Sequence, residues 1–153
     1  MAPPSRRHQR ISGELFGIIR DYIRKKNGPC EVYAAPFGVQ LNADDDTTIV
    51  EPDISVICDK DKLTDRGCTG APDWIIEIVS TSNPAHDYIR KLNLYYKAGV
   101  RLYWIVDSNT DSVAVYDFEN KELIPVEYSF DDKVDVGIYG DFAVDFSEIK
   151  KEL

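Results

Sequence analysis

Three segments decide the fold of this chain: VEPDISVI at residues 50–57, DWIIEIV at residues 73–79 and DYIRKLNLY at residues 87–95. The first two are apolar runs typical of strands, and each contains one acid, Asp53 or Glu77. The third has the spacing of a helix and contains Lys91. Burying an acid is unfavourable unless the acid is paired or binds a metal. Two acids on neighbouring buried strands therefore predict a divalent-cation site.

Length and composition limit the class of protein. At 153 residues and 43% hydrophobic, the chain can bury one core, and we expect a single domain over residues 1–153. No run approaches the roughly 20 apolar residues that span a bilayer, and no signal peptide is apparent, so we expect a cytoplasmic protein without membrane contact. Cys30, Cys58 and Cys68 lack metal-site spacing and are expected to be reduced thiols.

The net charge of −9 argues against loose, non-specific adhesion to nucleic acid. It leaves room for a site where local arginine and lysine meet a phosphate beside a bound cation. The run Asp44 to Asp46 is expected in an exposed hairpin or loop.

The pattern outside the three segments predicts an α/β fold. An apolar stripe from Ile11 to Ile23 has helical spacing. Residues 31–41 alternate as in a strand, with Pro36 and Gly38 indicating a bulge or an edge position, and residues 42–47 are turn-like. Further predictions are a central strand at 74–79, a helix from about 84 to 98, strands at 102–106 and 113–118, weaker strands at 123–128 and 134–138, and a helical turn in the tail.

The two acids suit catalytic metal chemistry. Mg²⁺ is usually held by one or two carboxylates and keeps several waters. Such a cation polarises a phosphoryl oxygen and makes a bound water more acidic. Asp87, Lys91 and Tyr95 are spaced by four residues and share a helix face. Lys91 could therefore point over the metal pocket, where it would orient or deprotonate the attacking water or neutralise charge on the phosphate.

The ordered motifs of the chain resemble the Uma2 family of restriction-endonuclease-like proteins, within the PD-(D/E)xK nuclease superfamily. The resemblance covers roughly residues 7–118. The motifs that carry it are APF at 35–37, EPD at 51–53, GAPD at 70–73, EIVS at 77–80, KLNLY at 91–95, AGV at 98–100 and YWIVD at 103–107.

The resemblance implies a restriction-endonuclease-like core, a central mixed β-sheet flanked by helices. It also implies that Asp53, Glu77 and the backbone carbonyl of Ile78 are the metal ligands, and that Glu14 corresponds to an acid on the first helix of many such nucleases. The chain departs from the PD-(D/E)xK pattern at Val79, which stands where the lysine is usual. In Uma2-like sequences a lysine on the next helix takes that place, and Lys91 fits it.

We therefore predict a Mg²⁺- or Mn²⁺-dependent phosphodiester hydrolase, a DNA endonuclease, in which Asp87 positions Lys91. A homodimer is a further expectation, because two-fold symmetry pairs the active sites that cut two strands. Two alternatives stay open: an inactive nuclease-fold binding or assembly module, and a hydrolase of small phosphate esters.

Purely structural, non-catalytic roles also stay open for these residues. Asp53 could cap a turn, and Glu77 could form only a structural ion pair with Lys91. Glu14 could be a solvated rim residue. His8 could serve as a ligand or a phosphate contact, but a lone histidine near a basic terminus is usually exposed, so His8 is left out of the predicted catalytic set.

Overall fold

The computed structural model describes residues 3–80 and 85–153, and the side chains of residues 85–88 lie outside this description. The helices are α1 (Arg6–Lys26), α2 (Ala85–Ala98) and α3 (Phe146–Lys151), with short 3-10 turns η1 (Lys60–Lys62) and η2 (Phe118–Asn120). The strands are β1 (Glu31–Ala34), β2 (Gly38–Asn42), β3 (Asp45–Val50), β4 (Ile54–Ile57), β5 (Leu63–Thr64), β6 (Gly67–Thr69), β7 (Trp74–Val79), β8 (Leu102–Asp107), β9 (Ser112–Asp117), β10 (Val126–Ser129), β11 (Lys133–Asp135) and β12 (Ala143–Asp145).

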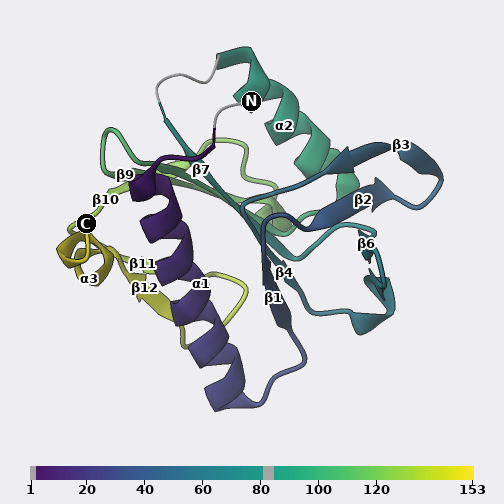
Figure 1. Cartoon of the computed structure of the whole chain (residues 1–153). Coiled ribbons are helices and arrows are strands. Elements are labelled where there is room, and N and C mark those ends of the chain that lie inside the picture. The colour runs from purple at the N-terminus through teal and green to yellow at the C-terminus, as the bar shows by residue number, and fades with distance from the viewer. Residues whose placement is uncertain (1–2, 81–84) are drawn as a thin grey trace.

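The centre of the fold is a sheet with the strand order β1-β4-β7-β8-β9-β10 (Figure 1). Only β7 and β8 pair in parallel; the other neighbours are antiparallel, so the sheet is mixed as predicted. Every residue of β7 is buried, which confirms the expected central strand. The α2 crossover between β7 and β8 is what allows these two strands to run in the same direction.

Helices cover both faces of this sheet. The apolar stripe of α1 buries Ile11, Leu15 and Ile19 against one face, and α3 packs on the same side (Figure 1). The other face packs against α2 and the smaller sheet β3-β2-β6-β5. Side chains alternate along a strand, so β7 directs Ile76 toward α1 and Ile75 toward α2. None of the described helices combines the length and apolarity needed to cross a membrane.

The region after α1 corrects two sequence predictions. The single strand expected at 31–41 is two strands in different sheets, because the chain turns at Pro36, which follows a cis peptide bond. Residues 42–47 do form the end of a hairpin, but the turn is only Ala43 and Asp44, and β3 begins at Asp45. The three consecutive aspartates at residues 44–46 led to the prediction of a turn instead of a strand, because aspartate is uncommon in strands.

The cysteine prediction was wrong for two of the three residues. Cys30 and Cys58 form a disulfide. They lie one step beyond the Glu31↔Ile57 pair of the antiparallel β1–β4 ladder, so strand register brings them together across 28 residues of sequence. Cys68 is a free, buried thiol, and burial raises its pKa to about 11.

Candidate active site

The register of β4 and β7 brings the two predicted acids together. These strands are antiparallel with Ile54 opposite Ile76, so Asp53, just before β4, lies across from Glu77 in β7. Asp53 is also tied to β7 directly, because its Oδ2 accepts a hydrogen bond from the Ile78 backbone N–H at 2.8 Å. The two carboxylates thus belong to one end of the β4–β7 pair.

Glu77 is almost completely buried, and α2 supplies a partner for each of its oxygens. The ammonium group of Lys91 lies 2.7 Å from Oε2, and the hydroxyl of Tyr95 donates to Oε1, also at 2.7 Å. This confirms that Lys91 and Tyr95 share a helix face. It also shows that the Glu77–Lys91 ion pair, which was the structural alternative for Glu77, does form. The side chain of Asp87 lies outside the described residues.

Tyr95 is a fixed hydrogen-bond donor in this cluster. Burial raises the pKa of its hydroxyl far above the usual value, and the neighbouring charges of Glu77 and Asp53 raise it further. The hydroxyl is therefore protonated at neutral pH. Because Asp53 and Glu77 both act on the same hydroxyl, their carboxylates share one electrostatic environment.

His8 is the site residue that the sequence did not predict. Its Nε2 lies 3.3 Å from Oδ1 of Asp53, and its side chain is only 19% exposed. The hydrogen bond to Asp53 raises the pKa of His8 above 6.5, although burial opposes this. The expectation of an exposed histidine was wrong because residues 6–10 are helical: Ser5 caps α1 and accepts from the His8 backbone N–H at 3.0 Å. The Ser5 cap was the signal that could have placed His8 in the first turn.

Glu14 does not join Asp53 and Glu77 through any contact that the structure shows. It is half-buried, and its Oε1 lies 3.9 Å from Arg10, one turn earlier. Six residues of α-helix turn the side-chain direction by about 120° away from that of His8. Glu14 therefore projects from a different flank of α1 than the histidine that reaches Asp53.

The donor atoms fit a cation that needs few protein ligands. Among the described residues, no group of three or more histidine, cysteine or acidic side chains could hold a metal ion. The donors that the resemblance implies are the backbone carbonyl of Ile78 and the carboxylates of Asp53 and Glu77, whose oxygens also have protein partners in this structure. Mg²⁺ is commonly held by one or two carboxylates with water completing its shell, so this donor set suits Mg²⁺ or Mn²⁺. It does not suit a closed structural zinc site.

Comparison with solved structures supports the fold. The chain is similar to the crystal structure of a putative nuclease belonging to DUF820 from Anabaena variabilis, with a TM-score of 0.77 and 19% sequence identity. The match covers 98% of this chain and 83% of the other. No curated protein matches the chain. At this identity the similarity establishes the architecture, a mixed sheet flanked by helices, and leaves the activity to be argued from the site.

Comparison with family models establishes the family. The model that matches residues 1–144 is Uma2, described as "Putative restriction endonuclease". The match covers the two carboxylates, Lys91 and His8 as well as the whole six-stranded sheet. The chain belongs to the Uma2 family.

Proposed function

We propose that the protein is a Mg²⁺- or Mn²⁺-dependent phosphodiester hydrolase that acts on DNA as an endonuclease. The observation that carries this proposal is the position of Lys91. Its ammonium group lies 2.7 Å from the carboxylate of Glu77 in β7, and Asp53 lies across from Glu77 at the start of the neighbouring strand β4. An acid pair with an adjacent lysine is the set of groups that a PD-(D/E)xK site requires, and here the lysine comes from α2. The proposal includes a single domain over residues 1–153, a homodimer and a cytoplasmic location. The Cys30–Cys58 disulfide removes the support that reduced cysteines would give to that location.

Each residue has a role that follows from its contacts. Asp53, Glu77 and the Ile78 carbonyl would hold the cation, which when bound polarises the phosphate and acidifies a water. The Ile78 N–H fixes the Asp53 carboxylate, and Tyr95 fixes that of Glu77. Because catalytic groups must be held in place before the substrate arrives, these two neutral donors are positioning groups.

Lys91 is more exposed than either carboxylate of the site. Its side chain is 43% exposed, whereas that of Glu77 is 9% exposed. The ammonium group can therefore meet a phosphate at the surface while it remains beside the buried carboxylate. There it would neutralise charge that develops on the phosphate or orient the attacking water. Hydrolysis forms a bond from the water oxygen to phosphorus and breaks one P–O ester bond, leaving a phosphate monoester and a hydroxyl.

The test is cleavage of supercoiled plasmid and of single-stranded DNA in Mg²⁺, Mn²⁺ and EDTA. We expect metal-dependent cutting that is lost in Glu77→Gln and Lys91→Ala. Lys97→Ala is the matched control, because Lys97 is exposed on the same helix. Cutting that persists in EDTA, or in Glu77→Gln, would contradict the proposal. Loss of cutting in Glu77→Gln alone would keep the enzyme and remove Lys91 from its mechanism.

A second candidate function is a binding or assembly module that has lost hydrolysis. It is favoured by one observation: both Glu77 oxygens already have protein partners, Lys91 and Tyr95. Calorimetric titration of Mn²⁺ into the protein and into Glu77→Gln separates the two candidates. Binding lost in Glu77→Gln, without cleavage by the unmodified protein, would support the module. Absence of binding would remove the metal site from both candidates.

A further inference from the structure

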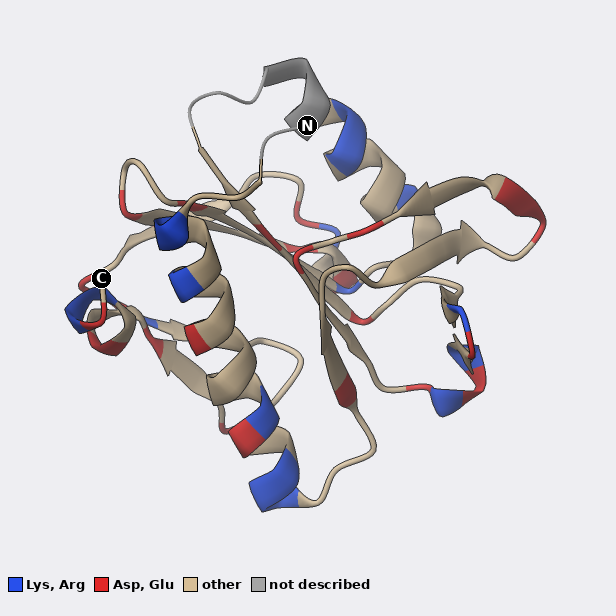
Figure 2. Ribbon diagram, in the orientation of Figure 1, with Lys and Arg blue, Asp and Glu red and all other residues tan. Residues whose placement is uncertain are grey.

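Helix α1 concentrates positive charge in an otherwise acidic protein. It has seven arginine or lysine residues and two acids, although the whole chain has a net charge of −9. Basic residues lie at both ends of the helix (Figure 2). Those near its start are largely neutralised: Arg7 pairs with Asp111, and Arg10 pairs with Glu152. Among the described residues, unpaired positive charge is therefore left at Arg6, the first residue of the helix, and farther along the helix.

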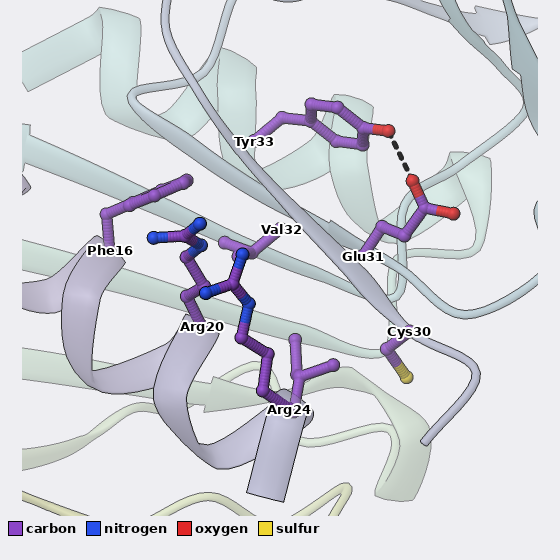
Figure 3. Close-up of a pocket in the computed structure, with 8 residues that line it drawn as sticks. Phe16, Arg20, Arg24, Cys30, Glu31, Val32 and Tyr33 are labelled. Atoms are coloured by element: carbon purple, nitrogen blue, oxygen red, sulfur yellow. Dashed lines mark hydrogen bonds between the residues drawn. The ribbon is translucent and has the colours of Figure 1, made fainter. Parts of the chain in front are cut away.

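Arg20 and Arg24 supply charge of this kind farther along the helix. Both are exposed, and neither side chain forms an ion pair or hydrogen bond in the part of the chain that the structure describes. They line a surface cavity of about 290 Å³ between α1 and β1, together with Phe16 and Tyr33. Figure 3 shows the two guanidinium groups reaching from α1 toward β1. The acid in this cavity, Glu31, accepts a hydrogen bond from the Tyr33 hydroxyl at 2.5 Å, and its other oxygen lies 3.8 Å from the ammonium group of Lys60.

The backbone of β1 offers a further donor in the same cavity. β1 is an edge strand of the large sheet. The Ala35 N–H donates to the carbonyl of Asp53, and hydrogen bonding alternates along an antiparallel pair. The N–H of Val32, three residues earlier, is thereby directed away from β4, toward the side where Val32 lines the cavity. Two guanidinium groups and a backbone N–H form a site suited to a phosphate.

The cavity lies farther along α1 than the active site. His8, which contacts Asp53, is in the first turn of the helix, and Arg20 and Arg24 follow it more than three turns later. At about 100° per residue, the two arginines point about 120° and 160° away from His8, toward the flank of α1 that lines the cavity with β1. At 1.5 Å per residue, the two arginines lie about 18–24 Å from His8 along the helix axis. At 3.4 Å per base pair, this is about five to seven base pairs of duplex.

We propose that the cavity between α1 and β1 binds backbone phosphates of duplex DNA about five to seven base pairs from the bond at Asp53. This inference rests on the proposed function, because the distance in base pairs is counted from a phosphodiester bound at Asp53. Arg20 and Arg24 contact the backbone without reading bases, so they add affinity and fix the orientation of the duplex rather than its sequence.

The experiment measures binding without hydrolysis, by fluorescence anisotropy of a labelled duplex of about 20 base pairs in EDTA, over a series of salt concentrations. The variant is the double substitution Arg20→Gln/Arg24→Gln. The matched control is Lys97→Gln/Lys121→Gln, which removes the same charge from exposed positions on other elements. Thermal unfolding checks that both variants remain folded.

Each phosphate contact contributes about −0.9 to the slope of log K against log salt, so losing two reduces the magnitude of the slope by about 1.8. Between 50 and 200 mM salt, the unmodified protein should then lose about tenfold more affinity than Arg20→Gln/Arg24→Gln. The control should keep the original slope. Equal slopes and affinities in the two double variants would overturn the inference and leave the proposed function standing. Absence of duplex binding by the unmodified protein at low salt would overturn both.

Discussion

The hydroxyl of Tyr95 offers the most direct test of the buried acid, through the substitution Tyr95→Phe. The change removes one oxygen and leaves the ring, which is fully buried and packs against Tyr103. The lost bond is a hydrogen bond of 2.7 Å to Oε1 of a buried carboxylate, Glu77. Hydrogen bonds to charged groups contribute about 1.5–3 kcal/mol, and leaving a buried acceptor unsatisfied belongs to the same range. We expect the free energy of unfolding to fall by that amount.

The assay is urea unfolding, with thermal unfolding as a second measure. For a chain of this length, about 1.5–3 kcal/mol corresponds to a fall in Tm of about 3–12 °C. Tyr96→Phe is the matched control, because Tyr96 is half-buried on the same helix and the structure shows no hydrogen bond from its hydroxyl. We expect this control to change the stability by less than about 0.5 kcal/mol.

A double-mutant cycle identifies the partner. In the background Glu77→Gln the acceptor is neutral, and the same bond contributes only about 0.5–1.5 kcal/mol. Tyr95→Phe should therefore cost about 1 kcal/mol less in that background than in the unmodified protein. Equal costs in the two backgrounds, or a Tyr95→Phe variant as stable as the Tyr96→Phe control, would refute a charged, hydrogen-bonded Glu77.

Three further predictions concern other parts of the molecule. Since the pKa of His8 is raised in the folded protein, the stability lost in His8→Asn should be greatest below about pH 6.5 and should decrease as the pH rises through the folded-state pKa. Urea unfolding at several pH values measures this loss, and a loss that does not depend on pH would contradict the prediction. Thiol titration without reductant should detect no reactive thiol in the native protein and one, Cys68, after denaturation, because Cys30 and Cys58 are joined and burial suppresses the Cys68 thiolate; three thiols without reductant would exclude the disulfide. Gly67→Ala should destabilise the protein by about 2 kcal/mol or more in urea unfolding, because the φ of Gly67 is +140° and an added Cβ would lie 2.1 Å from a backbone oxygen of β2. The control Gly137→Ala should be tolerated, because there is open space around Gly137.

Much of the fold could be predicted from the sequence because local patterns carry it. The apolar stripe of α1, the nearly continuous apolar run of β7 and the strands β8 and β9 all follow from periodicity. The helical turn in the tail, α3, was also correctly expected. The small sheet was not, because its strands β5 and β6 are only two and three residues long. Elements that short have no periodic signal of their own.

Part of the candidate site could likewise be predicted from the sequence, and part of it could not. The sequence alone determined which residues are chemically unusual: an acid inside the apolar strand β7, an acid before β4, and a lysine and tyrosine four residues apart on one helix face. Those choices follow from the cost of burying charge and from the period of the helix. They also sufficed to name Asp53, Glu77 and Lys91 as the proposed catalytic set.

Only the tertiary structure decided which partners meet. It placed His8 against Asp53 across 45 residues of sequence and left Glu14 with Arg10, and it joined Cys30 to Cys58. It also aligned Arg20 and Arg24 with the edge of β1. The physical reason is common to all of these contacts. A side chain's spacing in its own helix or strand fixes the direction in which it points, whereas the group that it meets depends on strand register and on how the helix is rotated against the sheet.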